Sequence, residues 1–119
     1  MSYSSSDVHK KVLGKKGERL VEAYLKDCGC KIIERNYKTP FGEADLIVSD
    51  QDEIAFVEVK TRTSDAYGVP AEAVGKLKRQ RYYKIAEFYW KKTGKEPNAR
   101  FDVAEVWADG KIEYYKYAF

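Results

Sequence analysis

Apolar residues recur at helical spacing in two long segments of the chain. The first runs from about residue 10 to residue 27, where Gly17, Leu20, Val21 and Tyr24 repeat on one face and Gly29 follows the end. The second covers residues 71–92 and ends near a glycine at position 94. We therefore predict two amphipathic helices, each with an apolar face that must pack against another element.

The remaining segments alternate apolar and polar residues, as strands do. Three such segments, at residues 31–38, 43–49 and 53–61, are separated by the turn sequence Thr39-Pro40-Phe41-Gly42 and by Asp50-Gln51-Asp52. Two more, at residues 100–107 and 111–118, flank Asp109-Gly110, a strong hairpin signal. The second helix is long enough to return the chain for parallel pairing. We expect an α/β fold with a mixed sheet, in the order α-β-β-β-α-β-β, flanked by helices.

Length and composition restrict the kind of protein. A chain of 119 residues forms one domain, here residues 1–119, and the Ser-rich residues 1–9 are expected to be disordered. No apolar run approaches the roughly 20 residues that span a bilayer, and no signal-peptide core is present, so we expect no membrane partner. Cys28 and Cys30 are too close in sequence for a strain-free disulfide. Buried or half-buried free thiols are therefore expected, which favours the cytoplasm.

Charge is distributed unevenly, although the net charge is only +3. Residues 10–19 hold five cations against one acid, and residues 76–92 hold seven cations against one acid. Between residues 43 and 58 there are six acids and no base. Acids between two basic segments suit a protein that binds a metal and a phosphate backbone. Lysine-rich helices that merely keep the surface soluble would give the same pattern.

Strand geometry brings several of these acids together. Glu58 and Lys60 project from the same face of the third strand. If the turn before this strand centres on residues 51 and 52, the second and third strands pair antiparallel, and the residue numbers of each pair add up to 103. Asp45 then lies opposite Glu58, and Glu43 lies opposite Lys60. Glu18 lies beside the apolar stripe of the first helix and can lean over the sheet. We expect Glu18, Asp45, Glu58 and Lys60 to share one patch.

Such a patch suggests metal-assisted phosphodiester hydrolysis. Carboxylates about 5 Å apart repel by roughly 3 kcal/mol, and a divalent cation removes that repulsion. Carboxylate oxygens suit Mg²⁺, for which Mn²⁺ can substitute, and no His or Cys is at hand to favour zinc. The bound ion would activate water, and Lys60 would position that water or neutralise the phosphate. The alternative is a surface hairpin with a Glu43–Lys60 ion pair and solvated acids.

Four cations are candidates for contact with nucleic acid. Lys78 and Arg81 fall within the angular range of the apolar stripe, so they either extend to the helix edge or reach the acids or a substrate phosphate. Arg62, with the two polar residues after it, would hold a DNA backbone or simply lie in a connecting loop over residues 62–70. Lys15 belongs to the basic segment of the first helix.

Two features near the C-terminus suggest roles outside the candidate active site. Asp102 shares a strand face with Ala104 and Val106, and we expect it to satisfy a local hydrogen bond rather than to bind a metal. The terminal strand would offer an edge for a homodimer, which the sequence leaves open.

Several motifs in order resemble the YraN family of small bacterial predicted endonucleases. They are Gly17-Glu18, Asn36-Tyr37, Gly42-Glu43-Ala44-Asp45-Leu46-Ile47, Phe56-Val57-Glu58-Val59-Lys60-Thr61-Arg62, Tyr67-Gly68-Val69-Pro70 and Arg100-Phe101-Asp102-Val103. The similarity spans about residues 14–106. That family is similar to archaeal Holliday junction resolvases and has the restriction-endonuclease-like fold, with a helix Glu, a strand Asp and a Glu-x-Lys in its active site.

The resemblance implies catalytic roles for Glu18, Asp45, Glu58 and Lys60, and adds the main-chain carbonyl of Val59 as a metal ligand beside the three acids. A glutamine-based motif of some related nucleases is not matched. The function expected is thus an Mg²⁺-dependent endonuclease acting on DNA, on branched or non-duplex DNA in repair or recombination. The alternative is a nucleic-acid-binding or adaptor domain that keeps the fold without turnover.

Overall fold

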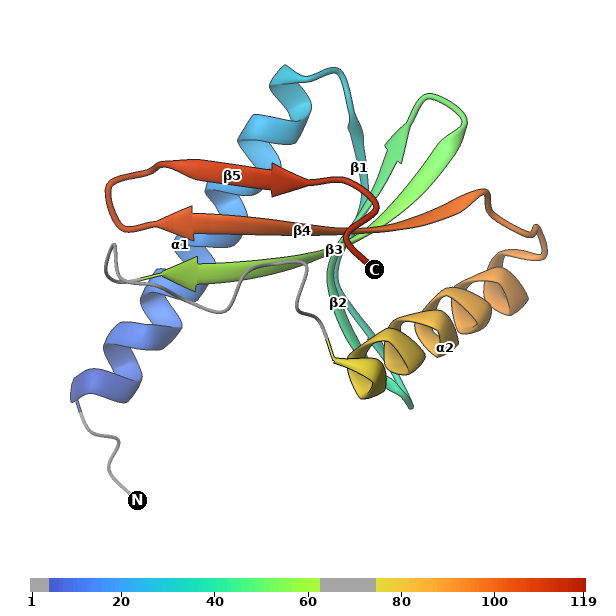
Figure 1. Cartoon of the computed structure of the whole chain (residues 1–119), viewed down its shortest axis with the longest axis horizontal. Coiled ribbons are helices and arrows are strands. Elements are labelled where there is room, and N and C mark those ends of the chain that lie inside the picture. The colour runs from blue at the N-terminus through green and yellow to red at the C-terminus, as the bar shows by residue number, and fades with distance from the viewer. Residues whose placement is uncertain (1–4, 63–74) are drawn as a thin grey trace.

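The computed structural model describes residues 5–62 and 75–119 and has a mixed α/β fold. Along the chain its elements are α1 (Ser5–Asp27), β1 (Lys31–Thr39), β2 (Gly42–Asp50), β3 (Glu53–Arg62), α2 (Lys76–Thr93), β4 (Ala99–Trp107) and β5 (Ile112–Tyr115). The five strands form one sheet in the order β1-β2-β3-β4-β5 (Figure 1). The α/β class expected from the sequence is therefore confirmed.

Element ends differ from the expected ones at three places. Helix α1 begins at Ser5, earlier than expected, because nothing between residues 5 and 10 breaks a helix; residues 1–4 lie outside the described part. Strand β3 continues to Arg62, which was expected to begin a loop over residues 62–70. The rest of that predicted loop and the expected first residues of the second helix, residues 71–74, lie outside the described part. Strand β5 ends at Tyr115, because Tyr117 has a left-handed φ of 54° and its N–H bonds to Asp102.

Two expectations from composition can also be compared with the structure. Cys28 and Cys30 are both free, but Cys28 is exposed and only Cys30 is half-buried, so the expectation of burial was wrong for Cys28. Cys28 lies where α1 ends and the chain turns toward β1. Neither α1 nor α2, within the described residues, is long and apolar enough to cross a membrane.

The sheet contains a single parallel pair, β3 with β4, joined through α2 as predicted. The predicted β2–β3 register is also confirmed: Leu46 pairs with Val57, and Ile47 with Phe56. That ladder ends at Leu46–Val57, one step short of Asp45 and Glu58. The two expected pairs beyond that point, Asp45 with Glu58 and Glu43 with Lys60, are therefore not part of the ladder. On their other sides Glu43 pairs with Lys38 of β1, and Lys60 pairs with Glu105 of β4.

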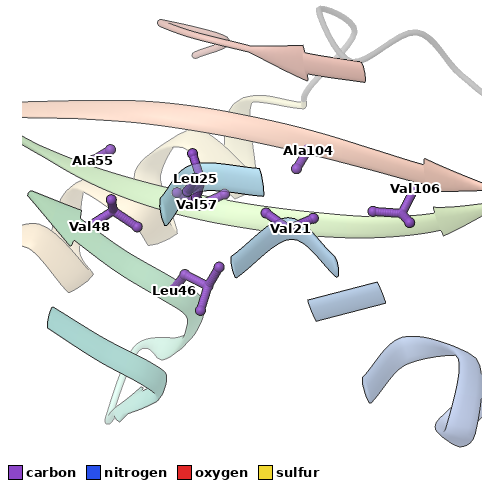
Figure 2. Close-up of a cluster of buried hydrophobic side chains, with 8 residues drawn as sticks. All are labelled: Val21, Leu25, Leu46, Val48, Ala55, Val57, Ala104 and Val106. Atoms are coloured by element: carbon purple, nitrogen blue, oxygen red, sulfur yellow. The ribbon is translucent and has the colours of Figure 1, made fainter. Parts of the chain in front are cut away.

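Each helix covers one face of the sheet with its own apolar core. On one face, Val21 and Leu25 of α1 pack on a cluster from β2, β3 and β4 (Figure 2), which consists of Leu46, Val48, Ala55, Val57, Ala104 and Val106. On the other face, Tyr82, Ile85 and Ala86 of α2 pack on Ala44, Ile47 and Phe56. Alternation along β3 supplies both cores, since Ala55 and Val57 point to α1 and Phe56 points to α2.

A buried ionic cluster ties the C-terminal strands together. Asp102 is fully buried and Arg100 is 3% exposed. Arg100 contacts three carboxylates, Asp102 at 3.0 Å, Glu53 at 3.0 Å and Asp50 at 2.9 Å. Asp102 also accepts hydrogen bonds from the Tyr114 hydroxyl at 2.6 Å and from the Tyr117 N–H at 3.0 Å. The prediction that Asp102 satisfies local hydrogen bonds is confirmed.

Replacing Asp102 with Asn should lower the free energy of unfolding by about 3 kcal/mol, because it leaves Arg100 buried with less compensating charge. Urea denaturation of the metal-free protein measures this change. The control is Glu87→Gln, which removes the exposed Glu87–Lys91 pair and should change stability by less than about 0.5 kcal/mol. Equal effects of the two substitutions would contradict a structural role for the cluster.

Candidate active site

The candidate site begins with Asp45, whose side chain accepts a backbone hydrogen bond from β3. Beyond the last β2–β3 pair, the Val59 N–H donates a hydrogen bond of 2.7 Å to Asp45 Oδ2. The carboxylate of Asp45 thus satisfies a donor on β3 past the end of the ladder. This bond holds Asp45 against the segment of β3 that contains Glu58 and Lys60.

Strand β1 has a backbone irregularity beside Asp45, between the pairs Arg35–Leu46 and Tyr37–Ala44. Asn36 has a left-handed φ of 50°, which asparagine tolerates better than most residues. Before it, Arg35 bonds to Glu22 of α1; after it, Tyr37 packs in the core under α2. The sequence analysis missed this change of face, although an Asn within a strand was the available signal.

Glu18 approaches the site from α1. Gly17, which precedes it, is buried, and a Cβ at this position would lie 2.8 Å from Thr61 Oγ1, so the glycine allows α1 to pack closely on the end of β3. The pKa of Glu18 is raised, mainly by burial and also by the charge of Glu43. The charge of Lys15 and a hydrogen bond with Asn36 oppose this shift.

Asp45 lies in the most negative surroundings of the site. Burial, the largest effect, and the charges of Glu18, Glu58 and Glu43 raise its pKa to about 6, against the opposing hydrogen bond from Val59. An acid that is this costly to ionise, with three other acids around it, marks a place where a cation would be stabilised.

Glu58 is only partly satisfied. Its Oε1 forms an ion pair with Lys78 of α2, while its Oε2 is buried without a hydrogen-bond partner among the described residues. Tyr82 of α2 lies close enough that the charges of Glu58 and Asp45 add to burial in raising its pKa. Glu58 and Asp45 therefore lie under the first turns of α2.

Lys60 is half-buried two residues farther along β3, beside Glu105 of β4. Glu105 is 6% exposed and accepts a hydrogen bond from Arg62 Nε at 3.1 Å. A buried acid thus flanks Lys60 on its β4 side. Glu105 was not predicted from the sequence; the available signal was an acid between the apolar residues Ala104 and Val106.

The carboxylates fit a magnesium site built on two acids. No group of three or more His, Cys, Asp or Glu side chains in the described part of the chain is arranged to hold a metal. Mg²⁺ commonly takes one or two carboxylates, with waters and substrate phosphates completing its octahedron. Asp45 and Glu58, which lie just past the last β2–β3 pair, match that pattern. Glu58 Oε2, which has no hydrogen-bond partner among the described residues, is an oxygen that such an ion would use. Glu18, the third acid expected at the metal, lies on α1, and its charge contributes to raising the pKa of Asp45.

The four candidate DNA-binding cations take different positions. Lys78 reaches the acids, which was one of the two alternatives for this residue, and Arg62 contacts Glu105. Arg81 is exposed, and its aliphatic stem crosses Gly42, where a Cβ would lie 2.7 Å from Arg81 Cδ. Lys15 is exposed beside Glu18, where the two residues line a cavity of about 200 Å³.

Comparison with known proteins identifies the family. The chain belongs to the uncharacterised protein family UPF0102, whose model matches residues 17–106. A UPF0102 protein of Syntrophus aciditrophicus is 51% identical over 94 residues, which cover 78% of this chain and 74% of that protein. One from Alkaliphilus metalliredigens is 46% identical over 112 residues, covering 92% and 98%. One from Moorella thermoacetica is 40% identical over 112 residues, covering 89% and 93%. The matched segment contains all four residues of the candidate site.

The raised pKa of Asp45 predicts how stability depends on pH in the metal-free protein. Below about pH 3.9 Asp45 is protonated in both the folded and the unfolded chain, so it contributes nothing. As pH rises toward 6 the unfolded chain releases the proton first, and above about pH 6 the free energy of unfolding is lower by about 3 kcal/mol. Glu18, whose pKa is also raised, contributes with the same sign.

Asp45→Asn should therefore be more stable than the wild type near pH 8 in EDTA, and this advantage should shrink near pH 4, because the amide oxygen still accepts the Val59 N–H without carrying charge. Urea denaturation at both pH values measures the difference. Glu87→Gln, on the exposed face of α2, is the control and should follow the wild type. An Asp45→Asn protein that is less stable at both pH values would show that the carboxylate is a structural group.

Proposed function

We propose that this protein is a metal-dependent endonuclease of the YraN type, with a restriction-endonuclease-like fold, that hydrolyses DNA phosphodiester bonds in the cytoplasm. The observation that supports it best is the position of Asp45. Its carboxylate is held by the Val59 N–H beside Glu58, in surroundings that raise its pKa to about 6. Purely structural acids, such as Asp102, are instead surrounded by donors and cations.

In this proposal Asp45, Glu58 and the Val59 carbonyl hold Mg²⁺, for which Mn²⁺ can substitute. When bound, the ion supplies Lewis-acid stabilisation of the phosphate and lowers the pKa of a bound water. Glu18, which reaches the site from α1, would orient an attacking water through its carboxylate. A hydrogen bond with Asn36 limits the directions in which Glu18 can point.

Lys60 has the role of stabilising charge. Lys60 lies on the strand that bears Glu58, next to Glu105 of the neighbouring strand β4. Directed at the scissile phosphate, it would donate hydrogen bonds to oxygens that gain negative charge in the transition state. Its contribution should then appear in the rate of cleavage rather than in the affinity for DNA.

The substrate is proposed to lie across the first half of α2. Arg81 crosses the β1–β2 turn, and Lys84 lies over the ring of Phe41 at 5.6 Å from its centroid, so cations border the acids on this side. These side chains are exposed and can contact phosphates. Branched or non-duplex DNA remains the proposed preference.

The proposed roles of Lys60 in catalysis and of Arg81 in DNA binding predict opposite effects when each residue is replaced. Lys60→Met should lower the cleavage rate at saturating DNA by about a hundredfold or more and leave the dissociation constant nearly unchanged. Arg81→Met should weaken binding and reduce its salt dependence, with the saturating rate preserved. Labelled linear, nicked, flap and four-way DNA, incubated with Mg²⁺, Mn²⁺ or EDTA, provide the assay.

Glu58→Gln is the control for contaminating nuclease, since any cleavage that persists in it does not come from this site. A Lys60→Met protein that cleaves at the wild-type rate would remove Lys60 from the mechanism. Salt-dependent DNA binding by the wild type, with no cleavage of any substrate in either metal, would refute the enzyme and support an adaptor domain.

A further inference from the structure

The ion pair between Lys78 and Glu58 links the first turn of α2 to β3 inside the candidate site. The side chains of Lys78 and Glu58 are 27% and 16% exposed, so neither is a freely solvated surface group. A pair buried to this degree is screened less by water than an exposed one. It therefore influences any cation that approaches Glu58.

The two oxygens of Glu58 differ in their surroundings. Oε1 contacts the Lys78 ammonium group, whereas Oε2 is buried without a partner in the described part of the chain. The negative charge of Glu58 is thus balanced by Lys78, but one of its two oxygens still lacks a hydrogen-bond donor among the described residues. A divalent cation bound to Glu58 would complete its ligands, but it would also repel the ammonium group only a few ångströms away.

We propose that Lys78 is a counter-ion built into the site: it holds Glu58 in place before metal enters, competes with the metal for that carboxylate, and once displaced binds a DNA phosphate. This inference rests on the proposed function. Lysine suits the role because its ammonium group is a compact charge on a flexible four-carbon stem. Displacement from Glu58 need not move the helix.

Two other cations on this part of α2, Arg81 and Lys84, do not contact Glu58 as Lys78 does. Arg81 lies across Gly42, and Lys84 lies over Phe41. Within residues 5–62 and 75–119, neither of them forms an ion pair with an acid, so a metal at Glu58 would release only Lys78 from that carboxylate. Arg81→Met is therefore the matched control, because it removes a nearby positive charge without breaking the pair.

Because Lys78 competes with the metal for Glu58 and can bind a DNA phosphate once released, metal binding and DNA binding are coupled. Metal binding frees a cation for the phosphate backbone, and a phosphate that takes Lys78 frees Glu58 for the metal. Each ligand should therefore raise the affinity of the other, and by the same factor.

The first test measures Mn²⁺ affinity without DNA, by electron paramagnetic resonance of the free ion. Lys78→Met should bind Mn²⁺ about tenfold more tightly than the wild type, the effect expected from removing one charge-assisted contact. Arg81→Met should stay within about twofold of the wild type. Lys78→Arg, which keeps a cation at Glu58, should restore the wild-type affinity, and Lys78→Gln should repeat the Met result if Met disturbs folding.

The second test measures the coupling in a Lys60→Met background, in which DNA cleavage is expected to be slowed by about a hundredfold or more, so that binding can be measured before the DNA is cut. Mn²⁺ should increase DNA affinity in this protein and in its Arg81→Met derivative, but the increase should be largely lost when Lys78→Met is added. Fluorescence anisotropy of labelled DNA with and without Mn²⁺ gives both affinities.

The outcomes separate this inference from the function on which it rests. If the wild type cleaves DNA with metal but Lys78→Met has the Mn²⁺ affinity of Arg81→Met, the counter-ion role is refuted and the nuclease stands. If Lys78→Met binds Mn²⁺ more weakly than the wild type, Lys78 supports the site rather than competing for it, and the inference is again overturned. If no variant binds Mn²⁺ and the wild type cuts no DNA, the proposed function fails and takes this inference with it.

Discussion

The hydrogen bond from the Val59 N–H to Asp45 is the contact on which the candidate site depends. It forms where the β2–β3 ladder stops, so a carboxylate takes the position that a backbone carbonyl would otherwise hold. The bond compensates only part of the cost of burying the acid, whose pKa still rises to about 6. The end of the β2–β3 ladder is therefore a place where acids gather, next to residues of both apolar cores: Ala44 and Leu46 flank Asp45 along β2.

Asp102 and Asp45 show how the same residue type can serve structure or chemistry. Asp102 contacts Arg100, Tyr114 and the Tyr117 N–H, so its oxygens are compensated within the protein. Asp45 has one backbone donor and acids around it. Stabilising an ion or a phosphate requires groups that the fold leaves uncompensated, and such groups reduce the stability of the empty site. This contrast is the physical basis for preferring a catalytic interpretation of Asp45 and a structural one of Asp102.

The sequence predicted the parts of the fold that follow from periodicity and turn chemistry. The β2–β3 register followed from a symmetric turn, and the parallel β3–β4 pair followed from a helix long enough to cross over. It could not predict that the β2–β3 ladder would stop at Leu46–Val57, because neither a glycine nor a proline stands at or beside that pair. Lys60 was therefore assigned Glu43 as its neighbour rather than Glu105, while Lys78 was left with two alternatives.

The central claim is that Asp45 and Glu58 jointly hold a divalent cation, and crystallography with anomalous scattering from Mn²⁺ tests it most directly. Crystals grown with Mn²⁺ should show one anomalous peak between the two carboxylates, with oxygen ligands at about 2.1 Å as in Mg²⁺ sites. The peak should disappear in Asp45→Asn crystals grown under the same conditions. A structure at saturating Mn²⁺ with no peak there, and with Lys78 still paired to Glu58, would contradict the account.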